Sequence, residues 1–221
     1  MAGVVSVDGR RVDKPGSTVG GGARLAVAAR EPFVSRAGRK LAAALEHFGI
    51  EPRGWVCLDA GASTGGFTDC LLERGAARVY ALDVGYGQLD ARLRSDPRVV
   101  VMERQNARHL APEALPEPCD LITVDVSFIA LAKVVPALLP HLRREGLLLP
   151  LIKPQFEAGR GVVGKGGILR DEALRRRVVE ECAAGLEGLG GLERSGLFDS
   201  PVAGSGGNRE AFALFIRRDP R

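Results

Sequence analysis

The four cysteines of this 221-residue chain form no C-x-x-C pair, and its three histidines show no H-x-x-x-H spacing. Zinc sites and redox-active thiols depend on such spacings. The sequence therefore argues against a bound metal and against a disulfide-exchange site. We expect all four thiols to be reduced, as in a cytoplasmic protein.

Long apolar runs are also lacking, since no stretch approaches the ~20 residues that a membrane helix needs. The first residues do not combine a basic start with an apolar core, as a signal peptide would. We therefore expect a cytoplasmic protein with no membrane contact. Hydrophobic residues make up 45% and charged residues 26% of the chain, which suits one α/β domain with a short appendage.

The positive charge is concentrated at one end of the sequence. Residues 1–54 contain nine Lys or Arg and five Asp or Glu, which gives +4, while the remainder contains 22 of each. A basic appendage on a neutral domain fits a polyanionic partner such as nucleic acid. An arginine-rich terminus that only aids solubility fits the charge equally well.

Residues 1–30 form a small β-rich piece, with a hairpin turn expected at Asp8-Gly9. From residue 31 onward we expect a single larger domain, which begins with a helix over residues 36–48, capped by Ser35. Apolar strands then alternate with helical patterns near residues 66–74, 128–144 and 171–188. The expected strands are residues 55–60, 77–83, 98–102, 120–125, 147–153, 192–198 and 211–217. This order indicates a doubly wound, mostly parallel α/β sheet.

A glycine-rich turn, LDAGASTGGFTD (58–69), follows the first of these strands. Ser63 stands where a dinucleotide motif has its middle glycine, and the turn lacks the lysine of a phosphate-binding P-loop. Asp83 ends the next strand and can bind ribose hydroxyls. A pocket for S-adenosyl-L-methionine fits this pattern better than a nicotinamide site, although any α/β fold needs glycine at this turn. The candidate cofactor residues are Asp59, Gly61, Ser63, Gly65, Gly66, Asp83 and Asn106.

Four charged residues suggest a second part of the site. Asp125 and Lys153 end two apolar strands, Lys40 lies in the helix before the first strand, and Glu210 precedes the last strand. Charges that end buried strands are costly unless they are paired or face a cleft, although two separate surface ion pairs would explain them too. A lysine beside a second cation can lose its proton and act as a base, with carboxylates orienting both amines.

Several segments together make the sequence resemble the TlyA family, a group of FtsJ-like methyltransferases often called hemolysins. They include FVSRAGRKLAAALEHFGI, LDAGASTGGFTDCLLERGA, VDVSFIAL, KPQFEAGRGVVGKGG and GNREAF. The resemblance implies a Rossmann-like methyltransferase sheet with an antiparallel last strand. It also implies methyl transfer from S-adenosyl-L-methionine to a ribose 2′-hydroxyl, of cytidine in known members, in ribosomal RNA. The family's Lys-Asp-Lys-Glu tetrad falls on Lys40, Asp125, Lys153 and Glu210.

The family usually begins with a small RNA-binding module, of which VSVDGRRVDKPGSTV resembles only the final hairpin. The sequence thus predicts a partial module over residues 1–30 and a methyltransferase domain over residues 31–221. Candidate RNA contacts are Arg36, Arg39, Phe128, Arg160 and Lys165. Phe128 could stack on a flipped base, but we expect it to fill the core.

Two other functions remain open at this level. A non-catalytic RNA-binding or ribosome-assembly factor could keep the basic surface without the paired lysines, and a hemolysin would need an amphipathic or spanning segment. A nicotinamide dehydrogenase is disfavoured by Ser63. The sequence does not indicate an oligomeric state.

Overall fold

The computed structural model describes residues 5–12, 16–27, 32–159, 164, 167–204 and 206–218. The chain divides into two compact units, residues 1–32 and residues 33–221.

The first unit contains an antiparallel sheet in the order β2-β1-β3. Its strands are β1 (Val5–Val7), β2 (Arg10–Arg11) and β3 (Leu25–Val27). Asp8 and Gly9 have φ values of 49° and 79°, the left-handed backbone that a tight hairpin turn needs, so the predicted turn is confirmed. Leu25 is 59% exposed, and a unit this small encloses little apolar surface.

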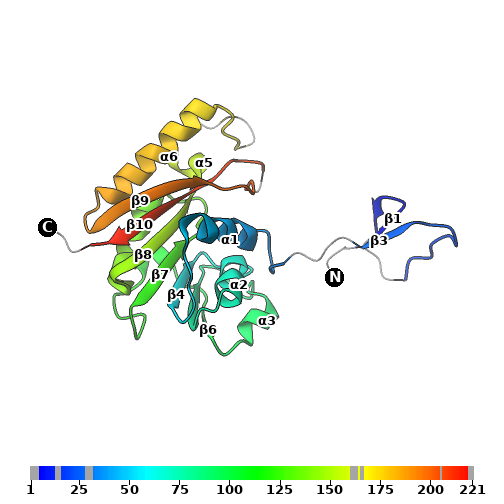
Figure 1. The fold of residues 1–221 in the computed structure, drawn as a ribbon, viewed down its shortest axis with the longest axis horizontal. Coiled ribbons are helices and arrows are strands. Elements are labelled where there is room, and N and C mark those ends of the chain that lie inside the picture. The colour runs from blue at the N-terminus through cyan, green and yellow to red at the C-terminus, as the bar shows by residue number, and fades with distance from the viewer. Residues whose placement is uncertain are drawn as a thin grey trace. The chain divides into compact units, whose positions relative to one another are not determined.

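The second unit is built on a seven-stranded sheet in the order β6-β5-β4-β7-β8-β10-β9 (Figure 1). β10 runs antiparallel to both neighbours, while the other neighbouring strands pair in parallel. The predicted sheet with an antiparallel last strand is therefore confirmed. The strands are β4 (Val56–Ala60), β5 (Arg78–Leu82), β6 (Val99–Met102), β7 (Cys119–Val124), β8 (Leu142–Ile152), β9 (Leu192–Asp199) and β10 (Ala211–Arg217).

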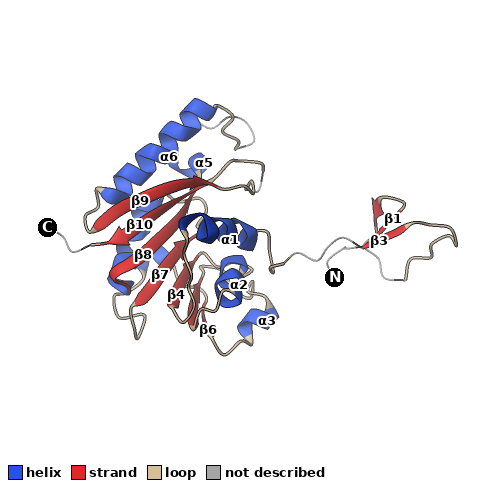
Figure 2. Ribbon diagram, in the orientation of Figure 1, coloured by secondary structure: helices blue, strands red, loops and turns tan. Residues whose placement is uncertain are grey.

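Helices cover both faces of this sheet (Figure 2). The longer ones are α1 (Ala37–Phe48), α2 (Gly66–Glu73) and α6 (Glu172–Glu187), and the single turns are α3 (Ala91–Arg94), α4 (Val135–Leu138) and α5 (Pro154–Glu157). Three short 3₁₀ helices complete the set, η1 (Ala107–His109), η2 (Leu131–Lys133) and η3 (Leu139–His141). One core packs α1 and α2 against the sheet, with Leu41, Phe67 and Phe212 in its interior. The other packs α4 and α6 against the opposite face around Ile122 and Phe215.

Three local predictions were wrong. The helix expected over residues 128–144 is broken into η2, α4 and η3, because Pro136 and Pro140 cannot continue a long helix. β8 begins at Leu142, five residues before its expected start, since an exposed polar segment extends its apolar half. Arg36, and not Ser35, stands at the N-cap of α1, and no side chain caps that end.

Candidate active site

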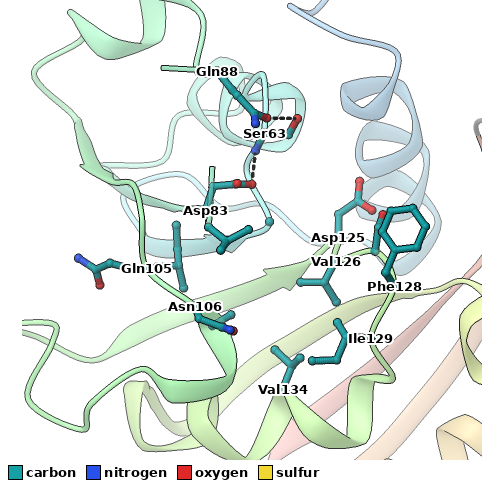
Figure 3. Close-up of a pocket in the computed structure, with 15 residues that line it drawn as sticks. Ser63, Asp83, Gln88, Gln105, Asn106, Asp125, Val126, Phe128, Ile129 and Val134 are labelled. Atoms are coloured by element: carbon teal, nitrogen blue, oxygen red, sulfur yellow. Dashed lines mark hydrogen bonds between the residues drawn. The ribbon is translucent and has the colours of Figure 1, made fainter. Parts of the chain in front are cut away.

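A pocket of about 430 Å³ opens at the carboxyl ends of β4, β5 and β7. The chain leaves β4 toward β5 on one side, and β7 lies on the other, so this is the point where the strand order reverses. Doubly wound sheets bind ligands at such a point, and the volume lies within the range of small-molecule sites. Figure 3 shows Ser63, Asp83 and Gln88 on one side of the pocket, and Asp125, Val126 and Phe128 on the other.

Asp83 links two loops of the pocket. One carboxylate oxygen accepts a 2.9 Å hydrogen bond from the Ser63 amide, and the other accepts a 2.6 Å bond from the Gly85 amide. Each carboxylate oxygen has two lone pairs, so both can accept a further hydrogen bond from a ligand. Asp83 thus keeps acceptor capacity for a ligand at the pocket, and its contact with ribose hydroxyls stays a prediction.

Gly61 lies where the loops after β4 and β7 meet. Its φ is +93°, and a Cβ at this position would lie 2.5 Å from the carbonyl oxygen of Asp125. Only glycine permits both this backbone conformation and this close approach. Asn106 lines the same pocket, and its side-chain oxygen accepts a hydrogen bond from the Arg108 amide.

Three residues predicted to contact the cofactor do not line this pocket. Gly65 and Gly66 begin α2, where added side chains would collide with Leu93 and Ser35 respectively. Asp59 is fully buried, and its Oδ2 accepts hydrogen bonds from the Thr68 amide (2.9 Å) and hydroxyl (2.8 Å). These contacts make the three residues supports for the turn, a role that the glycine pattern alone does not distinguish from ligand contact.

Burial raises the pKa of Asp59 from 3.8 to about 7, and the negative charge of Asp125 adds to this effect, while the hydrogen bonds from Thr68 oppose it. A carboxyl group beneath the pocket therefore titrates near neutral pH. Its protonation affects the turn through Thr68, because that residue lies in the first turn of α2.

The four charged residues singled out in the sequence form two ion pairs. Lys40 Nζ lies 2.6 Å from Glu210 Oε2, and Lys153 Nζ lies 2.6 Å from Asp125 Oδ1. Lys40, Lys153 and Glu210 are only 8%, 9% and 2% exposed. These are buried pairs, so the sequence-level alternative of two surface ion pairs is wrong.

Strand register brings the two pairs to one edge of the sheet. Ala211 of β10 pairs with Ile152 of β8 in an antiparallel ladder. The next positions outward are Glu210 and Lys153, so they stand opposite each other where the ladder ends. Asp125 follows directly on β7, the other neighbour of β8. The site therefore depends on β10 being antiparallel, because only that direction returns residue 210 to the carboxyl edge.

The loop after β7 adds a hydroxyl and an aromatic ring. Ser127 Oγ lies 3.0 Å from Lys153 Nζ and lines the pocket. Phe128 is 90% exposed, which overturns our expectation that it fills the core. Its φ of +64° is unusual for a bulky residue and turns the ring outward at the pocket, where it lies 4.9 Å from the ring of Phe156.

Sequence analysis missed Ser127, Gln88, Gln105 and Asn208. The two glutamines line the pocket. Asn208 is 5% exposed and holds the segment that precedes α6, because its side chain accepts from the Leu169 amide and donates to the Gly167 carbonyl. Its place two residues before Glu210 was a usable signal. Glutamines on loops give no such sequence signal, since they have no characteristic spacing.

Of the predicted RNA contacts, Arg36 and Arg39 are exposed near the start of α1. Arg160 and Lys165 lie outside the described residues. In the described part of the chain, no helix is long and apolar enough to cross a membrane.

The pocket residues fit S-adenosylmethionine. Asp83 offers acceptors for ribose hydroxyls, Gly61 leaves room for close approach, and the apolar side chains of Val84, Ile129 and Val134 can flank a planar base. A Rossmann-like sheet with this pocket and the adjacent buried lysines fits the methyltransferase class.

Comparison with known proteins narrows this class. The model of the FtsJ-like methyltransferase family matches residues 33–217. The 16S/23S rRNA (cytidine-2′-O)-methyltransferase TlyA of Mycobacterium tuberculosis is 50% identical over 98% of this chain and 81% of its own length. Hemolysin A of Brachyspira hyodysenteriae is 43% identical over 98% and 90%. The solved structure of a candidate hemolysin from Streptococcus thermophilus is 40% identical, with a TM-score of 0.85 over 100% of this chain and 81% of that one.

The chain belongs to the FtsJ-like methyltransferases and, within them, to the TlyA family. It is an S-adenosylmethionine-dependent methyltransferase, as its sequence predicted.

Proposed function

We propose that this protein methylates the ribose 2′-hydroxyl of a cytidine in ribosomal RNA and that it acts on ribosomal subunits in the cytoplasm. The observation that carries the proposal is the pair of buried ion pairs, Lys40–Glu210 and Lys153–Asp125, at the carboxyl edge of the sheet. The relative named as an rRNA cytidine-2′-O-methyltransferase supports the choice of substrate.

Bound S-adenosylmethionine supplies an electrophilic methyl group, and the chain must position and deprotonate the hydroxyl that receives it. We assign proton removal to Lys153, because its partners Asp125 and Ser127 both line the cofactor pocket. In its neutral form, Lys153 Nζ would take the hydroxyl proton while the oxygen forms its bond to the methyl carbon and the bond between that carbon and the cofactor sulfur breaks. Asp125 orients the amine and then stabilises the ammonium that results.

Lys40 and Glu210 complete the arrangement. Lys40 engages Glu210 at 2.6 Å, which leaves Asp125 as the carboxylate partner of Lys153. The strand register sets Glu210 opposite Lys153, so the second pair lies beside the proposed base. Correct placement of two reacting groups can lower a barrier by roughly 7–11 kcal/mol.

RNA contact is proposed for Arg36, Arg39 and Phe128. Both arginines are exposed and lie close in sequence to Lys40, where they can neutralise phosphates. The exposed ring of Phe128 at the pocket offers a stacking surface for the target base. We also propose that residues 1–30 contribute part of an RNA-binding module.

The test is transfer of tritiated methyl groups from S-adenosylmethionine to unmodified ribosomal subunits by the wild-type protein and two variants. Lys153→Ala removes the proposed base. Lys133→Ala is the matched control, since Lys133 is an exposed lysine on η2 that does not line the pocket. Cofactor binding is measured for each protein by calorimetry.

We expect label in RNA at a single site that resists alkaline cleavage, because 2′-O-methylation blocks attack by that hydroxyl. Label should fall by at least about 100-fold in Lys153→Ala and stay unchanged in Lys133→Ala. Undiminished transfer by Lys153→Ala would remove lysine from the base role. Label in alkali-labile RNA alone would place the methyl group elsewhere than on the ribose.

A further inference from the structure

We infer that Ser127 is a positioning residue that fixes the orientation of the Lys153 amine, an inference that rests on the proposed role of Lys153 as the base. Ser127 Oγ lies 3.0 Å from Lys153 Nζ. Ser127 lines the pocket together with Asp125, the other partner of the same nitrogen.

The argument starts from the shape of a primary amine. In the neutral form that accepts a proton, the nitrogen has two N–H bonds and one lone pair, arranged roughly as a tetrahedron with the carbon chain. The Ser127 hydroxyl oxygen at 3.0 Å accepts one N–H, whereas Asp125 Oδ1 lies 2.6 Å from the nitrogen without forming a hydrogen bond to it. Ser127 is therefore the partner that fixes an N–H direction, and with it the directions left to the lone pair. Without this hydrogen bond the amine would be able to rotate about its Cδ–Cε and Cε–Nζ bonds.

Contacts from α5 hold Ser127 in place. Glu157 accepts a 2.9 Å hydrogen bond from the Leu131 amide and so ties the far end of the 125–131 loop. Phe156 contacts Phe128, the residue after Ser127. α5 begins directly after Lys153. The two ends of the Lys153–Ser127 hydrogen bond are therefore carried by segments that are also joined to each other.

The experiment measures single-turnover methyl transfer to ribosomal subunits by Ser127→Ala, Ser127→Thr and the proposed base variant Lys153→Ala. Ser95→Ala is the control, since Ser95 is an exposed serine whose hydroxyl bonds only locally, to the Arg92 carbonyl. The rate constant, KM for subunits and Kd for S-adenosylmethionine are measured for each protein.

We expect the rate constant of Ser127→Ala to fall roughly 10- to 100-fold, the scale of a lost hydrogen bond to a charged or reacting group. KM and the cofactor Kd should stay within about twofold, and Ser127→Thr should recover most of the rate because it restores the hydroxyl. A residue that only stabilised the fold would not show this split between rate and binding.

A wild-type rate in Ser127→Ala beside an inactive Lys153→Ala would overturn this inference and leave the proposed function intact. Loss of cofactor binding in Ser127→Ala would also overturn it, since Ser127 would then build the pocket. Full activity in Lys153→Ala would refute the proposed base role of Lys153 and this inference together, while ribose methylation itself would stand.

Discussion

The buried carboxyl of Asp59 should make the stability of the protein depend on pH in a predictable direction. Its pKa is raised from 3.8 to about 7, chiefly by burial. The folded state therefore holds this proton more tightly than the unfolded chain. Stability from this group is fully present below about pH 4, is lost as pH rises toward 7 and is constant above that. Asp59→Asn removes the titration and keeps an oxygen that can accept the hydrogen bonds from Thr68.

The size of the effect follows from the two pKa values. Between pH 5 and pH 8 the unfolded carboxyl is already ionised, while the folded one loses its proton only near pH 7. Each pH unit over which only the folded form keeps the proton contributes ~1.4 kcal/mol. Between pH 5 and pH 8, the free energy of unfolding of the wild-type protein should therefore fall by roughly 2–3 kcal/mol relative to that of Asp59→Asn.

Urea unfolding of both proteins at pH 5, 6, 7 and 8 measures this difference, because contributions from the other titrating groups cancel in the comparison. The groups that bear on Asp59 are Thr68, Thr123, Asp83 and Asp125. All remain in the variant. Parallel stability curves across this range would refute the claim that Asp59 binds a proton more tightly in the folded state.

Three further substitutions test separate parts of the site. Asp83→Ala should weaken cofactor binding at least 10-fold by calorimetry, and an unchanged Kd would mean that the pocket is misplaced. Gly204→Ala puts a Cβ 2.2 Å from Glu210 Oε1, so it should lower kcat at least 10-fold and cost ~1–3 kcal/mol in urea unfolding. Gly185→Ala on α6, where an added Cβ meets no atom within 4 Å beyond its own helix backbone and chain neighbours, should do neither, and equal losses in both would contradict the steric argument. Phe128→Ala should raise KM for subunits by roughly 5- to 100-fold, since stacking contributes ~1–3 kcal/mol per base. It should leave stability within ~0.5 kcal/mol because the ring is 90% exposed, and an unchanged KM would exclude stacking.

Strands were easier to predict than the segments between them. The apolar runs that became β4, β5 and β7 are buried on both faces, so continuous hydrophobicity identified them. The prediction of one helix over residues 128–144 was wrong because it relied on the apolar spacing and gave too little weight to the two prolines. The polar start of β8 was missed because it is exposed and lacks an apolar run.

The residues of the site also differ in how well the sequence predicted them. Asp125 and Lys153 could be found because a charge at the end of a buried strand is rare and conspicuous. The exposure of Phe128 could not be predicted, because it depends on a positive φ that a Ser-Phe sequence does not indicate. Asp59 looked like a ligand contact because the turn motif is the same whether its acid faces a ligand or supports the turn from below.

The position of β10 determines when the central sheet can be completed during folding. β10 lies between β8 and β9 and pairs with both, although it follows both of them in the sequence. During synthesis, β8 and β9 exist before the strand that joins them, and Glu210 arrives immediately ahead of it. A nascent chain that stops short of Ala211 therefore presents two unpaired strand edges where β10 should insert and cannot align the Lys40 pair with Lys153. Insertion of β10 therefore completes the sheet and brings the two ion pairs together in a single step.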